Sequence, residues 1–127
     1  MAKRLLIADD AEIMREIIKD TATQAGWEVV GIAQDGQEAV DKYKQLQPDA
    51  VTLDMVMPVY DGLHALRGIL AYDANAIVLI VSALDQRNVL KEAFKTGATD
   101  FIVKPFDKAD LVSALNTHAS RQDATTR

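Results

Sequence analysis

The sequence predicts an α/β protein in which helices cover both faces of one parallel β-sheet. Short runs rich in Val, Ile and Leu alternate along the chain with segments whose apolar residues recur every three or four positions. This alternation is typical of βα units that share a parallel sheet. The 127 residues suit one domain with a self-sufficient core. We therefore expect a three-layer sandwich.

Five segments have the character of strands. They cover residues 5–8, 28–33, 50–53, 77–81 and 101–103. All but the second are continuously apolar, which indicates strands that are buried on both faces. Right-handed crossovers leave few ways to connect five parallel strands. The flavodoxin-like strand order 2-1-3-4-5 is the natural candidate at this length.

Five intervening segments have helical periodicity. In the first, apolar residues between Met14 and Ala25 lie at three- and four-residue steps, and the pattern returns in residues 39–46, 63–70, 90–94 and 111–115. Gly26 and Gly97 follow two of these segments and are expected to end them, because a left-handed backbone costs glycine little. We expect a domain over residues 1–120 and a polar C-terminal tail over residues 121–127.

Composition narrows the possible partners. The formal net charge is −5, with 19 acidic and 14 basic residues, which argues against binding to nucleic acid. The absence of cysteine excludes a disulfide framework and a thiolate metal site. The longest apolar run, residues 76–81, is too short to cross a bilayer, and no signal-peptide cleavage site follows the N-terminus. We expect a cytoplasmic protein that binds neither nucleic acid nor membranes directly.

Three carboxylates follow two strands that should be neighbours. Asp9 and Asp10 come after the first strand, and Asp54 comes after the third. Ligands of open parallel sheets bind beyond the carboxyl ends of the strands, where the strand order reverses. Three carboxylates gathered there would repel one another, and Mg²⁺, which prefers oxygen ligands, would offset their charge. Asp9 or Asp10 alone could instead cap the following helix, but Asp54 at the reversal point favours a metal site.

The other two strand ends carry hydrogen-bond donors instead of carboxylates. Ser82 ends the fourth strand and offers a hydroxyl donor, while Lys104 ends the fifth and offers a mobile cation. A carboxylate, a hydroxyl, an ammonium and a metal ion together suit an aspartate that becomes phosphorylated, and aspartyl phosphates are known covalent intermediates. The sequence thus predicts a site for a phosphorylated aspartate.

Four motifs, in this order along the chain, resemble the receiver domains of two-component response regulators, and especially their stand-alone chemotaxis members of the CheY type. The motifs are LLIADD at 5–10, VTLDMVMPVYDG at 51–62, IVSA at 80–83 and DFIVKPF at 100–106. The resemblance covers the whole domain. It implies a signalling protein that catalyses its own phosphorylation and slow dephosphorylation rather than a metabolic enzyme.

The resemblance implies a role for each matching residue. Asp54 would accept a phosphoryl group from a histidine kinase or a phosphotransfer domain. Asp9, Asp10 and Asp54 would bind Mg²⁺ together with the backbone carbonyl of Val56. Ser82 and Lys104 would then grip the phosphoryl group.

The resemblance also implies a switch. Ser82 would move toward the phosphoryl group and vacate space for Phe101, while the bond between Lys104 and Pro105 would be cis. A monomer is expected to pass this change to a downstream protein, for which a flagellar motor switch is one candidate. Val56 and Leu84, two residues past Asp54 and Ser82, are apolar where family members often carry polar side chains. Slow self-dephosphorylation is therefore expected, because neither side chain can orient water.

Three other interpretations compete with this one. A haloacid-dehalogenase-type phosphohydrolase needs Asp-x-Asp after the first strand, but Ala11 stands two residues after Asp9. Flavin phosphate beside that strand would be repelled by the acidic pair. The chain could also be the receiver of a longer regulator with a DNA-binding or enzymatic output. The start at Met1 and the short polar tail favour a stand-alone protein.

Overall fold

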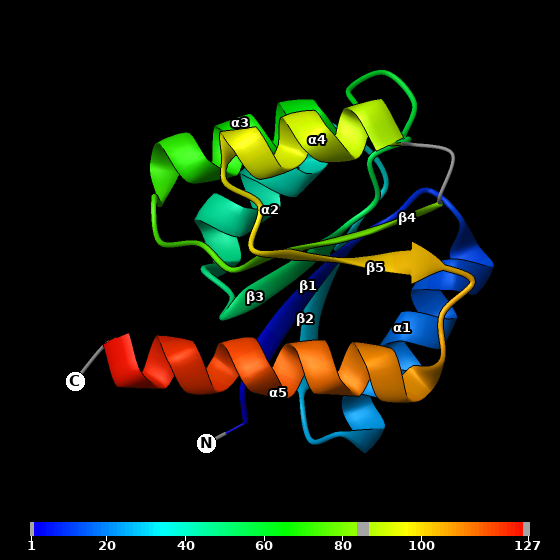
Figure 1. Cartoon of the computed structure of the whole chain (residues 1–127), viewed down its shortest axis with the longest axis vertical. Coiled ribbons are helices and arrows are strands. Elements are labelled where there is room, and N and C mark those ends of the chain that lie inside the picture. The colour runs from blue at the N-terminus through cyan, green and yellow to red at the C-terminus, as the bar shows by residue number, and fades with distance from the viewer. Residues whose placement is uncertain (1, 84–86, 126–127) are drawn as a thin grey trace.

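Five βα units follow one another in the computed structural model, which describes residues 2–83 and 87–125 (Figure 1). The elements in chain order are β1 Arg4–Ala8, α1 Glu12–Gln24, β2 Glu28–Ala33, α2 Gly36–Leu46, β3 Ala50–Leu53, α3 Gly62–Tyr72, β4 Val78–Ala83, α4 Arg87–Thr96, β5 Asp100–Lys104 and α5 Lys108–Thr125. Leu84, to which the sequence assigns a role in slow self-dephosphorylation, lies outside the described residues.

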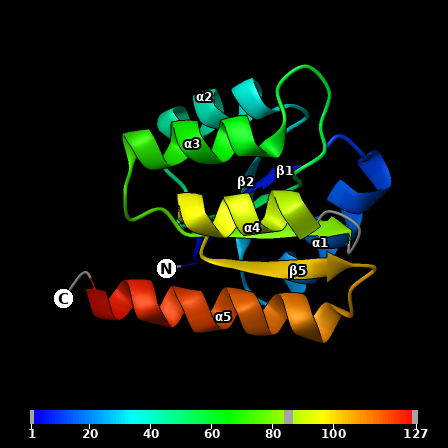
Figure 2. The same ribbon diagram turned by 45° about the horizontal axis from the view of Figure 1, so that its top comes forward.

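The sheet has the predicted topology. Its strand order is β2-β1-β3-β4-β5, and every neighbouring pair is parallel. Helices α2, α3 and α4 cover one face, whereas α1 and α5 cover the other (Figures 1 and 2). The predicted flavodoxin-like three-layer sandwich is confirmed. The order reverses between β1 and β3, so their carboxyl ends flank the expected crevice.

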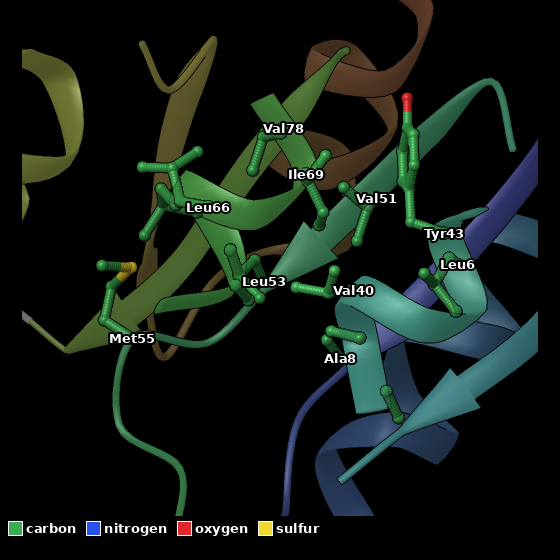
Figure 3. Close-up of a cluster of buried hydrophobic side chains, with 14 of the residues drawn as sticks. Leu6, Ala8, Val40, Tyr43, Val51, Leu53, Met55, Leu66, Ile69 and Val78 are labelled. Atoms are coloured by element: carbon green, nitrogen blue, oxygen red, sulfur yellow. The ribbon is translucent and has the colours of Figure 1, made fainter. Parts of the chain in front are cut away.

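Each strand supplies side chains to two separate cores. Leu6 and Ala8 of β1 point into the core beneath α2 and α3, which Figure 3 shows, whereas Leu5 and Ile7 point toward α1 and α5. Successive side chains of a strand face opposite ways, so a strand covered on both faces must be apolar throughout. Trp27, just before β2, is buried in the core beneath α1 and α5. Both faces of the sheet are therefore fixed by packing.

The structure moves several expected boundaries. Ser82 lies inside β4, because it and Ala83 still pair with Val103 and Lys104 of the neighbouring edge strand. The helix α5 runs to Thr125, and the expected domain end at residue 120 stays a prediction. Gly26 and Gly97 have positive φ angles of 93° and 129° after α1 and α4, as predicted.

None of the helices in the described part of the chain is long and apolar enough to cross a membrane.

Candidate functional site

The predicted carboxylates meet at the carboxyl end of β1 and β3. The amide of Asp54 donates to Ala8 O at 2.9 Å, and that of Asp9 donates to Ala33 O at 3.0 Å, so both residues continue the sheet by one hydrogen bond. One oxygen each of Asp9, Asp10 and Asp54 lies within 4.8 Å of the others. Asp9 and Asp54 are buried, at 1% and 8% exposure, whereas Asp10 is exposed. The strand-end reasoning placed all three correctly.

Lys104 reaches these carboxylates from β5, although β4 lies between β5 and β3. Its Nζ atom is 2.8 Å from Asp9 Oδ2 and 3.2 Å from Asp54 Oδ2. The other oxygens are held by main-chain donors: Ala11 N donates to Asp9 Oδ1 at 2.9 Å, and Val56 N donates to Asp54 Oδ1 at 3.2 Å. Two of the three carboxylates are thus fixed before any ligand binds.

Burial and charge set the protonation of this cluster. Burial raises the pKa of Asp54 above its usual value, and the charge of Asp9 adds to that effect, while Lys104 and the Val56 amide oppose it. Burial by itself would lower the pKa of Lys104, but hydrogen bonds to Asp9 and Asp54 and their charges raise it. Lys104 therefore stays charged, and one ammonium faces three carboxylates.

The donor set fits a hard divalent cation. Mg²⁺ prefers oxygen ligands in octahedral geometry and is usually held by one or two carboxylates together with water or phosphate. Three converging carboxylates offer such oxygens, and Lys104 offsets only part of their charge. The Val56 amide contacts Asp54, which places the backbone of Val56 beside the same carboxylate. The role of the Val56 carbonyl stays a prediction.

Ser82 places a buried hydroxyl at the edge of the site. The residue is 2% exposed, and its Oγ atom has no hydrogen-bond partner in the described part of the chain. A buried polar group without a partner costs about 1–3 kcal/mol. The neighbouring strand brings Lys104 level with Ala83, the residue after Ser82. Ser82 therefore keeps an open hydrogen-bonding capacity at the edge of the site.

Phe101 lies on the same sheet face as Ser82. Ile80 pairs with Phe101 and Ser82 pairs with Val103, so Ser82 and Phe101 are diagonal neighbours on adjacent strands. The Phe101 ring is 39% exposed. It packs edge-on against Phe94 of α4, with 5.6 Å between ring centroids. Phe94 is itself exposed, at 42%.

The bond between Lys104 and Pro105 is cis, as the resemblance implied. Pro105 itself is exposed beside the end of β5.

The loop after Asp54 is folded tightly against its own start. Gly62 N donates to Met55 O at 3.1 Å, and a Cβ atom at residue 62 would lie only 2.3 Å from the main-chain oxygen of Asp54. Within the loop, Val59 has a φ of 65°, which is rare for a β-branched residue. The loop geometry therefore carries backbone strain next to the carboxylate.

Sequence reasoning missed Arg15. Its Nη1 atom donates to the main-chain oxygen of Asp9 at 3.0 Å. A single arginine in an amphipathic helix resembles any solvated residue, so no pattern in the sequence distinguishes it.

Comparisons with known proteins agree with this geometry. The model of the family described as "Response regulator receiver domain" matches residues 5–116. The chemotaxis protein CheY of Thermotoga maritima is 51% identical over 116 residues, which cover 91% of this chain and 97% of that protein. CheY of Bacillus subtilis is 47% identical over the same shares of each chain. A solved CheX-CheY-BeF₃-Mg²⁺ complex from Borrelia burgdorferi has a TM-score of 0.86 at 37% identity, covering 91% of this chain and 87% of that one.

Proposed function

The chain belongs to the response regulator receiver domain family, as its motifs predicted, and we propose that it is a stand-alone switch whose Asp54 is phosphorylated with the help of Mg²⁺. It is a receiver of the CheY type, for which phosphorylation-dependent switching is the general function. The observation that carries the proposal is the convergence of Asp9, Asp10, Asp54 and Lys104 at one end of the sheet. The phosphoryl donor is proposed to be a histidine kinase or a phosphotransfer domain.

The proposed transfer needs positioning and charge neutralisation more than acid–base chemistry. A carboxylate oxygen of Asp54 forms the new O–P bond as the N–P bond of the donor's phosphohistidine breaks, and the electron pair leaves with the imidazole. When bound by Asp9, Asp10, Asp54 and the Val56 carbonyl, Mg²⁺ would offset the negative charge of the carboxylates and the phosphoryl oxygens. Lys104 donates to the same phosphoryl group, and its present hydrogen bond to Asp54 keeps it within reach.

The hydroxyl of Ser82, which has no partner among the described residues, supports the proposed switch. A phosphoryl group on Asp54 offers new acceptor oxygens, and a hydroxyl without a partner gains a hydrogen bond by moving toward them. Phe101, its diagonal neighbour on β5, is proposed to turn into the space that Ser82 leaves. This face of the sheet, with Pro105 at its edge, would then have two packings, one with Phe101 turned outward and one with it turned inward. Phosphorylation would shift the population toward the second. A downstream protein would distinguish them.

Several further properties are part of the proposal. The protein is proposed to act as a monomer in the cytoplasm, with a receiver over residues 1–120 and a tail over residues 121–127. A flagellar motor switch is one candidate target, in keeping with the chemotaxis proteins that the chain resembles. Transfer of label from a set of purified histidine kinases, followed by capture of proteins that bind only the phosphorylated form, tests donor and target in turn.

Labelling by a small phosphodonor tests the core of the proposal. Wild-type protein in acetyl phosphate and Mg²⁺ is expected to gain one phosphoryl group by intact-protein mass, and EDTA should prevent the gain. Asp54→Asn should gain none, whereas the matched variant Asp41→Asn, on the exposed face of α2, should label as wild type does. Labelling of Asp54→Asn, or none of wild type, would overturn the proposal. Continuous turnover without a lasting adduct would indicate a phosphohydrolase instead.

Val56 is proposed to prolong the life of the phosphoryl group. Its side chain is 54% exposed, two residues past Asp54, and cannot orient an attacking water by hydrogen bonding. Val56→Asn should therefore shorten the lifetime of the label several-fold. The reason is that the Asn side chain can orient an attacking water through one hydrogen bond. An unchanged decay rate would count against this role. Leu84, given the same role, lies outside the described residues.

A further inference from the structure

We infer that Arg15 is a positioning residue for the acidic pair, because its guanidinium holds the peptide unit that joins Asp9 to Asp10. This inference rests on the proposed magnesium site. Arg15 lies in α1, where its amide donates to Ala11 O at 3.0 Å, and its side chain turns back so that Nη1 donates to Asp9 O at 3.0 Å. The side chain is half-buried between the helix and the loop.

The bonded oxygen determines the direction of Asp10. A peptide unit is planar from one Cα atom to the next, so an oxygen fixed on Asp9 restricts the Cα–Cβ direction of the following residue. The Ala11 amide also donates to Asp9 Oδ1, so this turn restrains the backbone of Asp10 from one side and Arg15 restrains it from the other. Arg15 thus reaches across the loop and fastens the point from which the Asp10 side chain leaves the backbone.

Asp10 is the carboxylate that most needs such support. Asp9 is fixed by Lys104 and the Ala11 amide, and Asp54 by Lys104 and the Val56 amide. The Asp10 carboxylate is exposed and makes no hydrogen bond within the described residues, yet one of its oxygens lies within 4.8 Å of the other two. Its place in the cluster therefore depends on the backbone rather than on partners of its own.

Arg15 and Lys104 differ in the atoms that they contact. Lys104 binds Asp9 Oδ2 and Asp54 Oδ2, so a metal ion must compete with its ammonium for carboxylate oxygens. Arg15 binds a main-chain oxygen and leaves the carboxylates free. By charge alone, removal of either residue would tighten binding of a divalent cation. If Arg15 acts by position, its removal weakens binding, and the two residues give effects of opposite sign.

Mg²⁺ affinities by titration calorimetry test this inference. Arg15→Met, which keeps the apolar stem without the donor, should weaken Mg²⁺ binding about tenfold, as is usual for the loss of a group that orients a ligand. Arg15→Lys retains one donor and should restore most of the affinity. Lys104→Met should bind Mg²⁺ more tightly than wild type. The matched control is Arg67→Met, because Arg67 is exposed and pairs only with Glu92 among the described residues, and it should leave the affinity unchanged.

A second readout needs no metal. The amide resonance of Asp10 should shift in metal-free Arg15→Met but not in Arg67→Met.

Mg²⁺ binding by Arg15→Met that equals or exceeds that of wild type would overturn the inference while the magnesium site stands. Absence of Mg²⁺ binding by wild type would overturn the site and the inference together. Urea unfolding checks that Arg15→Met is folded. If it is not, Arg15→Gln, which is also uncharged and has a shorter side chain than Arg, replaces it with the same expected outcomes.

Discussion

The two ends of the sheet treat polar groups in opposite ways. At the amino end, the Tyr43 hydroxyl donates to Asp73 Oδ2 at 3.0 Å, and Asp49 Oδ2 accepts the amide of Arg4 at 2.7 Å. At the carboxyl end, one ammonium pairs with two of the three clustered carboxylates, and a buried hydroxyl has no partner among the described residues. The named polar groups of the amino end are paired, whereas the carboxyl end keeps the excess negative charge and the hydroxyl that the proposed Mg²⁺ and phosphoryl group would use.

The same physical cause acts differently at the two ends. Burial, together with Asp73, raises the pKa of the Tyr43 phenol, which therefore remains a hydrogen-bond donor at any ordinary pH. Burial also raises the pKa of Asp54, but there the charged form is the one that a metal ion or a phosphoryl donor requires. Desolvation thus supports the structure at one end and opposes the functional protonation state at the other.

The largest expected effect comes from the backbone beside Asp54. Gly62→Ala places a Cβ atom 2.3 Å from Asp54 O and 2.6 Å from Met55 Cα, so the loop must move. We expect a loss of about 3 kcal/mol in the free energy of unfolding, measured by urea denaturation. The matched variant at the amino end is Gly26→Ala, which meets no atom within 4 Å and should cost only about 1 kcal/mol, for its positive φ. Equal losses would show that the two ends are packed alike.

Next in size is the effect of the Asp54 charge. Since its pKa is raised in the folded state, folding favours the neutral form. This contribution to stability is complete below the pKa of an unfolded aspartate, about 3.9, and is lost as the pH rises through the raised value. Metal-free Asp54→Asn should therefore be more stable than wild type at pH 7, by about 1–2 kcal/mol.

The advantage of Asp54→Asn should shrink as the pH falls toward 3 and when Mg²⁺ is added, because protons or metal then relieve the wild type. Thermal unfolding of both proteins between pH 7 and pH 3, with and without Mg²⁺, measures this difference in stability. An advantage that does not depend on pH would assign the effect to packing rather than charge.

A smaller effect distinguishes the hydroxyl of Tyr43, which donates to Asp73, from that of Ser82, which has no partner among the described residues. Tyr43→Phe removes the donor to Asp73 and should cost about 1 kcal/mol. Ser82→Ala removes a buried hydroxyl that has no described partner and should be neutral or stabilising by up to about 1 kcal/mol. Urea midpoints of the two variants give the comparison directly. A clear loss in Ser82→Ala would mean that its hydroxyl already has a partner in the resting protein.

The smallest expected effect concerns the strained loop. Val59 is 87% exposed and holds a φ of 65°, so its side chain gains little packing in return for the strain. Val59→Asn should raise the free energy of unfolding by about 0.5–1 kcal/mol, because Asn tolerates this region of φ. Lys95→Asn, at an exposed position in α4, provides a control for the effect of Asn itself. A loss of stability in Val59→Asn would place the strain elsewhere.

The parts of the site that lie on strand ends could be predicted, and the parts that depend on side-chain direction could not. Asp9, Asp54 and Lys104 follow or end apolar runs, and a parallel sheet brings such positions to one edge. The bond from Arg15 to Asp9, by contrast, depends on a side chain that turns back along its helix. The exposure of Phe94 also escaped prediction, because a residue at the edge of an apolar stripe can face either the core or solvent.

The position of Trp27 has a practical consequence for all of these measurements. It is the chain's single tryptophan, and it is buried just before β2, at the end of the sheet away from the acidic cluster. Its amide donates to Ala22 O at the end of α1. Its fluorescence should respond to loss of the α1 and α5 core but hardly to ligands at Asp54. One intrinsic optical signal can therefore follow global unfolding with and without Mg²⁺, free of quenching by the occupied site.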